Sequence, residues 1–166
     1  LSDSETCEIG DILVDQGVAY AKSVSDVITN VTRSTSTNQK SVIGVFVQEN
    51  PTHVPVPLSK EVITTVGTGP STTTSSTHII DPIHDSIMEN KTIVAMNSLG
   101  EGQVNVCGEN GDIEIGDLIS SSSTTGKGMK QDDDIVRSCT VGKAREAVTF
   151  ASASSTARLA CIYMCG

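Results

Sequence analysis

The chain has 166 residues, of which 37% are hydrophobic and only 2% aromatic, and its formal net charge is -9. This length fits one domain, and so few aromatic residues leave Val, Ile, Ala and Leu to build its core. The acidic balance repels a nucleic-acid backbone, and no basic stripe with interleaved aromatic residues offsets it, so we expect no nucleic-acid binding. No apolar run approaches the roughly 20 residues of a membrane-spanning helix, so we expect no membrane insertion.

Hydrophobic residues recur in β-branched runs of strand length, bounded by Gly, Asn, Asp and Pro. This pattern is typical of strands and predicts an all-β protein, a compact single domain of short strands and hairpins. The predicted strands are Asp11–Val14, Val18–Lys22, Ser41–Gln48, Thr92–Asn97, Gln103–Cys107, Ile113–Ile115, Asp117–Ser120, Val136–Val141 and Arg158–Met164.

Turn and helix signals refine this prediction. The dipeptide Asn110-Gly111 tolerates positive φ and predicts a hairpin joining the strands that end at Cys107 and begin at Ile113. A second turn that requires glycine is predicted at 125–128. The i, i+3, i+4, i+7 spacing of apolar residues within Val24–Val31 predicts a helix.

Residues 50–82 contain all five prolines and the Ser/Thr tract 71–77. Such a composition buries too little surface to order itself alone, although Val54–Val66 has enough apolar residues for an edge strand. We therefore divide the chain into a first β block at 1–49, a Pro/Ser/Thr-rich excursion at 50–87 and a second β block of the same domain at 88–166. The excursion is either a mobile loop or an arm over a neighbouring subunit.

The five cysteines are an odd number, so at least one is not paired within the chain. Cys161 and Cys165 lie in an alternating apolar segment, where sulfur is more often a small buried hydrophobe than a metal ligand. The acidic cluster 131–134 lacks the spacing of a calcium loop, and Gly126-Lys127 lacks the flanking residues of a phosphate loop. We expect neither a metal nor a cofactor.

Two sequence features could carry acid–base chemistry. His84 lies between Asp81 and Asp85, which could orient its imidazole as a general base, with a solvated loop histidine as the alternative. At the start of the chain, Ser2, Asp3, Glu5 and Glu8 place carboxylates beside a hydroxyl. They could activate that hydroxyl or polarise a carbonyl if burial or crowding raised one carboxyl pKa, and the alternative is an exposed terminus.

Two blocks of sequence are similar to a known family. They include Gly10–Val14, Val42–Val47, Ile93–Met96, Gly102–Val106, Gly111–Ile119, Gly126–Gln131 and Val141–Glu146. Gly10-Asp11-Ile12-Leu13 and Gly116-Asp117-Leu118-Ile119 open the two halves in the same manner. This order resembles the C-terminal domain of bacteriophage tail-spike and tail-fibre proteins called the intramolecular-chaperone autoproteolytic domain, or peptidase G2, in marine-phage versions that end like 160–166. The excursion at 50–87 is unmatched.

The resemblance implies a domain at the distal end of a virion fibre that brings three identical chains into register below an upstream stalk. A start at Leu1 rather than Met agrees with a domain cut from a longer fibre. Family members that cleave themselves do so near the domain's own start, using an Asp followed at three-residue intervals by two glutamates. Glu5 and Glu8 fit that spacing, whereas Ser2 fills the Asp position and Asp3 comes one residue later.

Three functions follow as hypotheses. The first is a structural virion component, a C-terminal domain for trimerisation and assembly of a phage tail fibre or spike. The second is a self-cleaving maturation peptidase with Ser2, Asp3, Glu5 and Glu8 at its site. The third is a fibre tip that binds a host-surface receptor or glycan, for which the chain offers few aromatic rings to stack on sugars.

Overall fold

The computed structural model describes residues 1–24, 26–50, 52, 58–67 and 72–165, and it confirms an all-β protein with a compact β domain. The strands are β1 (Ile12–Ala21), β2 (Val27–Arg33), β3 (Val42–Glu49), β4 (Ser59–Val66), β5 (Thr73–Ile80), β6 (Val94–Asn97), β7 (Leu99–Cys107), β8 (Leu118–Ser121), β9 (Gly128–Lys130), β10 (Thr140–Ala144) and β11 (Thr156–Met164). A short helix α1 (His84–Met88) follows β5, and a 3-10 turn (Gly108–Asn110) follows β7.

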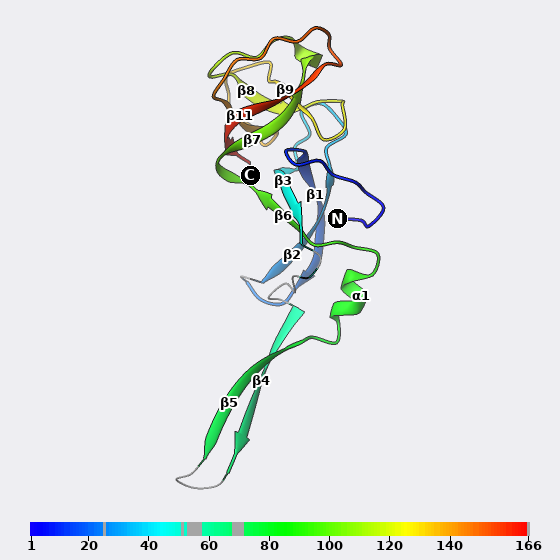
Figure 1. The fold of residues 1–166 in the computed structure, drawn as a ribbon, viewed down its shortest axis with the longest axis vertical. Helices are drawn as coiled ribbons and strands as arrows, with labels where there is room; N and C mark the ends of the chain where they lie inside the picture. Colours follow the sequence, from blue (N-terminus) through cyan, green and yellow to red (C-terminus); the bar gives the residue numbers. More distant parts are fainter. Residues whose placement is uncertain (25, 51, 53–57, 68–71, 166) are drawn as a thin grey trace.

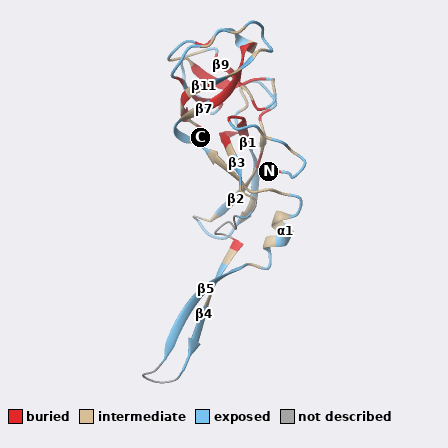
Figure 2. Cartoon of the chain, in the orientation of Figure 1, coloured by how far each residue is buried: buried red, intermediate tan, exposed pale blue. Residues whose placement is uncertain are grey.

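The strands form three units that follow one another along the longest axis of the molecule (Figure 1). β10, β11, β7, β9 and β8 close into a small barrel, and β2, β1, β3 and β6 form a four-stranded sheet in that order. β4 and β5 pair only with each other, and their hairpin extends away from the sheet (Figure 1). Burial is concentrated in the barrel and in the adjoining part of the sheet, whereas the hairpin is exposed (Figure 2).

β1 joins the sheet to the barrel because its first three residues are apolar and buried on both faces. Ile12, Leu13 and Val14 are each fully buried. Successive side chains of a strand point to opposite faces. Ile12 and Val14 accordingly belong to the cluster that fills the barrel, whereas Leu13 packs in a second cluster that includes Phe46. One short apolar run thus belongs to both cores.

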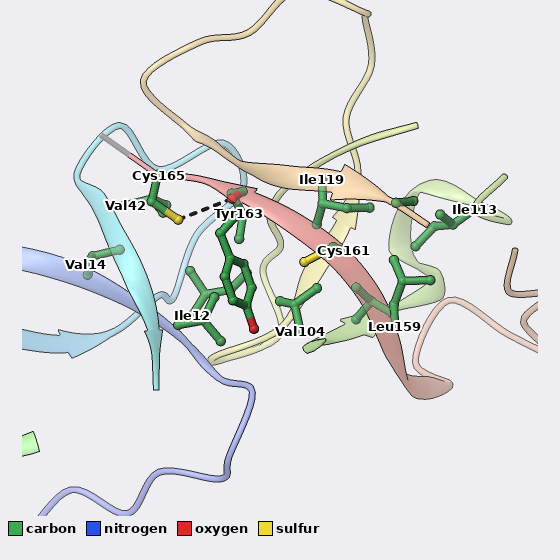
Figure 3. Packing of buried hydrophobic residues seen from close by; sticks show 14 residues of the cluster. Ile12, Val14, Val42, Val104, Ile113, Ile119, Leu159, Cys161, Tyr163 and Cys165 are labelled. Atoms are coloured by element: carbon green, nitrogen blue, oxygen red, sulfur yellow. Dashed lines mark hydrogen bonds between the residues drawn. The ribbon is translucent and has the colours of Figure 1, made fainter. Parts of the chain in front are cut away.

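The barrel core is built on β7 and β11, which pair antiparallel over their whole length from Cys107 opposite Thr156 to Leu99 opposite Met164. Their inward side chains meet the start of β1, as Ile12, Val104 and Tyr163 show (Figure 3). Cys161 and Cys165 are buried in this cluster, and the Cys165 thiol donates to the Val141 carbonyl over 3.2 Å. The interpretation of these two cysteines as core residues agrees with their positions.

The predicted helix at Val24–Val31 is wrong. Residues 27–33 form β2 and pair antiparallel with β1, Val24 is fully exposed, and Ser25 lies outside the described residues. The apolar spacing matched a helix, but β-branched residues lose rotamer freedom in helices and pack well on a pleated sheet. Pairing with β1 therefore determines the conformation of this segment.

The hairpin predicted at Asn110-Gly111 is also wrong, although the chain does turn there. Gly111 has φ +83°, but β7 pairs with β11 and β9 rather than with the segment that follows the turn. Ile113 makes only an isolated bridge to Val148, so no strand forms at 113–115. The long alternating strand β11 offers nine paired positions, more than a local hairpin could.

Other strand predictions differ mainly in their bounds. The strand predicted at Val136–Val141 begins only at Thr140, because Val136 is exposed. The two predicted strands Asp11–Val14 and Val18–Lys22 are one strand, β1, with register shifts between them. Of the predicted edge strand 54–66, residues 54–57 lie outside the described part of the chain and 59–66 form β4. The turn at 125–128 is confirmed, with Gly126 at φ +74° between β8 and β9.

Candidate functional site

The acidic segment at the start of the chain lies against the four-stranded sheet. Leu1 is buried in the second apolar cluster, and its amino group donates to the Thr92 carbonyl over 3.3 Å. Ser2 forms an antiparallel bridge with Lys91, and the Asp3 amide donates to the Asn90 carbonyl. The segment is therefore held by the chain that leads into β6.

Ser2 and Glu5 line the same cavity, which has a volume of about 390 Å³ and is also bordered by Thr32 and Lys91. Glu5 is firmly held there. Its carboxylate accepts from the Thr32 hydroxyl at 2.8 Å and from the Arg33 amide at 2.8 Å, and it pairs with the Arg33 guanidinium at 3.4 Å. These contacts fix the end of β2 to the start of the chain.

Asp3 and Glu8 lie elsewhere. Asp3 accepts from the Thr92 hydroxyl at 2.6 Å on an exposed surface. Glu8 pairs with Lys127 at 2.7 Å and lines a second cavity, of about 330 Å³, with Asn105 and Arg158. The four predicted site residues therefore do not share one cavity.

The contacts of Ser2 are those of a turn rather than of an activated nucleophile. Its hydroxyl hydrogen-bonds to the hydroxyl of Ser4 at 2.9 Å. A serine nucleophile needs a base within hydrogen-bond reach, about 2.6–3.2 Å. The carboxylate of Glu5 instead accepts from Thr32 and Arg33. Within residues 1–8, the Ser2 hydroxyl thus hydrogen-bonds to the Ser4 hydroxyl and not to a carboxylate.

A polar network that the sequence did not predict lies where the sheet meets the barrel, and it is centred on Asp11. This carboxylate is completely buried. Its Oδ1 accepts from Lys127 Nζ at 2.7 Å and from Asn105 Nδ2 at 2.9 Å, and its Oδ2 accepts from the Glu8 amide at 3.0 Å. Arg33 Nη1 lies 4.0 Å from Oδ2. Buried charges require such pairing.

Glycines allow this network to close. Gly10 has φ +97°, and a Cβ there would come within 2.9 Å of Asn105 Oδ1. Gly126 has φ +74°, and a Cβ there would come within 2.7 Å of Asp11 Cγ. Both positions thus need a residue that tolerates left-handed backbone and has no side chain.

Lys127 connects the buried and exposed parts of the network. Its side chain is 13% exposed and contacts both Asp11 and Glu8 at 2.7 Å. Burial lowers the pKa of Lys127, but the hydrogen bonds to the two carboxylates outweigh burial, so the pKa lies above its ordinary value. The side chain is held as an ammonium ion between two carboxylates.

The same turn occurs a second time in the chain. The sequence Glu-Ile-Gly-Asp occupies 8–11 and 114–117, each time directly before a strand that begins with buried residues. In the second copy the Glu114 amide donates to Asp117 Oδ2 at 2.8 Å, and Lys130 Nζ pairs with the same oxygen at 2.8 Å. This second pair is more exposed, with 17% of the Asp117 side chain and 35% of the Lys130 side chain accessible.

Sequence reasoning missed the Asp11 network because its members are far apart along the chain. Asp11 and Lys127 are 116 residues apart, and Asn105 is 94 residues from Asp11. The available signal was a glycine beside each charged residue, in Gly10-Asp11 and Gly126-Lys127. A glycine beside a charged residue allows another segment to approach closely, but the sequence does not say which segment that is.

The other sequence candidates lie at the start of α1, for His84, and in the loop between β9 and β10, for the acidic cluster. His84 Nδ1 lies 3.0 Å from Asp85 Oδ1, which belongs to a carboxylate that is almost fully exposed. In the acidic cluster, Gln131 Nε2 donates to the Asp133 and Ile135 carbonyls, and Asp133 pairs with Arg137. These contacts stabilise the loop between β9 and β10.

Among the described residues, no three His, Cys, Asp or Glu side chains are grouped as metal ligands. In the same part of the chain, no helix has the length and apolarity needed to cross a bilayer. No protein-family model, curated protein or solved structure matches the chain.

Proposed function

We propose that the chain is a structural assembly domain that joins identical chains in a trimeric appendage, such as a bacteriophage tail fibre below its stalk. The observation that carries the proposal is the β4–β5 hairpin, which extends beyond the sheet with almost all of its side chains exposed (Figures 1 and 2). A two-stranded hairpin alone is marginally stable in water. Packing against a neighbouring chain would cover the exposed side chains of this hairpin and stabilise it.

Apolar side chains lie on both faces of the hairpin. The register places Val62, Val66 and Ile79 on one face and Ile63 and Ile80 on the other, because directly opposed residues share a face. The last four of these are between 47% and 65% exposed. Exposed apolar side chains gathered on one element are typical of interaction surfaces.

The hairpin also has few of the charges that keep strand edges from pairing with other chains. Lys60, Glu61 and His78 are its ionisable residues, and all three lie in the half nearer the sheet. The remaining positions toward the tip are Val, Ile, Thr and Ser. Edge strands of isolated proteins are commonly protected by charge or proline, so this composition favours a hairpin that is covered in the assembly.

The base of the hairpin is anchored to the domain. Leu58 is fully buried, the Asp81 amide donates to its carbonyl at 2.7 Å, and Lys22 Nζ donates to the Ser59 carbonyl at 2.9 Å. An anchored base with exposed strands is the geometry of an arm that reaches a neighbour, and we expect the neighbour to be a second copy of this chain.

Light scattering and sedimentation of the full chain test the proposal. We expect a particle of three times 17.3 kDa, and we expect it to dissociate when Ile63, Val66, Ile79 and Ile80 are replaced together by Thr, which keeps strand propensity. The matched control replaces Leu99 and Ile115, which are also exposed but lie outside the hairpin, by Thr. A monomeric wild-type chain, or equal dissociation in the control, would contradict the proposal.

The two alternative functions receive less support from the geometry. For self-cleavage, Ser2 and Glu5 share a cavity, but Glu8 lies at another one and Ser2 contacts a hydroxyl. For glycan binding, Phe46 and Tyr163 are buried and cannot stack on a sugar, which leaves only the half-buried Tyr20 and Phe150. The assembly function therefore accounts best for the described residues.

A further inference from the structure

Lys127 Nζ lies 2.7 Å from Asp11 Oδ1 and 2.7 Å from Glu8 Oε2. The Asp11 side chain is completely buried and that of Lys127 is 13% exposed, so an amine and a carboxyl group are held in contact with little access to water. We propose that Lys127 and Asp11 condense into an intramolecular isopeptide bond, with Glu8 carrying the protons. This proposal does not depend on the assembly function.

Proximity lowers the barrier to forming such a bond. Holding two reacting groups in contact is equivalent to an effective concentration on the order of 10⁵–10⁸ M. Free amines and carboxylates do not condense in water at ordinary concentrations, but the fold fixes this pair from three directions. Gly10 and Gly126 let the backbone approach, and Asn105 holds the carboxylate from β7.

The step balances without an oxidant or an activating group. A proton passes from the Lys127 ammonium to the Glu8 carboxylate, and the neutral amine then attacks Cγ of Asp11. The C–N bond forms as one C–O bond of Asp11 breaks. Two of the three ammonium protons leave with that oxygen as water, Glu8 carrying each in turn, and the third stays on the amide nitrogen. Glu8 ends in the charge state in which it began.

The positions of the neighbouring groups suit these roles. A proton carrier must lie within hydrogen-bond reach of the group that gives up the proton, and Glu8 Oε2 lies 2.7 Å from Lys127 Nζ. The Asn105 amide and the Glu8 backbone N–H donate to the two Asp11 oxygens at 2.9 and 3.0 Å, where negative charge develops during attack. Glu8 is 74% exposed, so the departing water has a path to solvent.

The ion pair between Lys127 and the two carboxylates slows the reaction. The carboxylates raise the pKa of Lys127 despite its burial, and an ammonium ion is not a nucleophile. Proton transfer to Glu8 must therefore precede attack, and we expect the bond to form slowly and only after folding. Once formed, it replaces two buried charges by a neutral amide and links the start of β1 to the β8–β9 turn across 116 residues.

Intact mass spectrometry of the folded 166-residue chain, followed over several days at neutral pH, tests the proposal. We expect the mass to fall by one water molecule, and proteolysis to yield one branched peptide that joins Lys127 to Asp11. Lys127→Arg keeps the positive charge but is expected to retain the full mass. Glu8→Gln is expected to slow the loss at least tenfold while circular dichroism stays unchanged.

The repeated turn provides the matched control. Lys130 pairs with Asp117 at a similar distance, but that pair is more exposed. We therefore expect Lys130→Arg to lose water as the wild type does. A folded wild type that keeps its full mass would overturn the proposal, as would water loss in Lys127→Arg. Mass is read after denaturation, so neither result depends on whether the chain forms trimers.

Discussion

Gly126 lies so close to Asp11 that a Cβ at position 126 would come within 2.7 Å of the Asp11 Cγ atom. This contact joins the β8–β9 turn of the barrel to the residue that precedes β1. The Ile12 amide donates to the Gly126 carbonyl at 2.8 Å, and the Gly126 amide donates to the Ser34 carbonyl at 2.8 Å. The junction between sheet and barrel is thus built from backbone contacts around one buried carboxylate.

We predict that Gly126→Ala lowers the free energy of unfolding by about 2–5 kcal/mol, because the left-handed backbone costs about 1–2 kcal/mol and overpacking against Asp11 costs a further 1–3 kcal/mol. Urea denaturation measures the change. Gly17→Ala is the control, since Gly17 also has positive φ, at +101°, but a Cβ there would meet nothing within 4 Å. Equal losses in the two variants would show that contact with Asp11 adds nothing.

The shared core predicts a second stability effect. Ile12 is fully buried in the barrel cluster although it belongs to a strand of the sheet (Figure 3). We predict that Ile12→Ala costs about 2–5 kcal/mol, as is typical of cavity-forming core substitutions. Ile115→Ala, at a residue that is 72% exposed, is expected to stay within about 0.5 kcal/mol of wild type. A cost for Ile12→Ala as small as that of the control would contradict a core shared by sheet and barrel.

Strand composition predicted the fold class because β-branched runs and glycine-bounded turns are local properties. The prediction of individual elements failed where a segment can pair either with its neighbour in the sequence or with a strand far along the chain. Asn110-Gly111 does turn the chain, but β7 gains more from pairing with β11 than from a local hairpin. The apolar spacing within 24–31 matched a helix only because four positions in a short window fit more than one period.

The candidate site was less predictable than the fold. Glu5 and Glu8 are three residues apart in the sequence, yet they contact the end of β2 and the β8–β9 turn respectively. Separation along the chain does not indicate which element each side chain will meet. Asp11 and Lys127 pair only because the barrel closes against β1, a relationship that no local motif encodes.

The thiol groups of Cys7, Cys161 and Cys165 should be unreactive in the folded protein. Burial raises the pKa of Cys161 to about 12 and the pKa of Cys165 to about 11, and burial likewise raises the pKa of the half-buried Cys7 to about 11. Since the thiolate is the reactive form, we predict slow alkylation of these three residues by iodoacetamide at pH 8 and rapid modification of all five cysteines in denaturant. Mass spectrometry counts the labels, and rapid labelling of Cys161 in the folded chain would contradict its place in the core.

The loop before β10 offers a test of charge pairing. Arg137 Nη2 lies 2.5 Å from Asp133 Oδ2, and this guanidinium, aided by the Ile135 amide, lowers the pKa of Asp133 from 3.8 to about 2. A lowered pKa means that the ionised carboxylate favours the folded loop, a contribution present above pH 3.8 and lost as the pH falls toward 2.

We predict that Arg137→Ala returns the Asp133 pKa most of the way to 3.8. Carbon-detected NMR titration of the carboxyl group measures it, with Arg145→Ala as the control because Arg145 pairs with Glu101 instead. A carboxyl that still titrates near pH 2 in Arg137→Ala would assign the lowered pKa to the backbone amide and to Gln131.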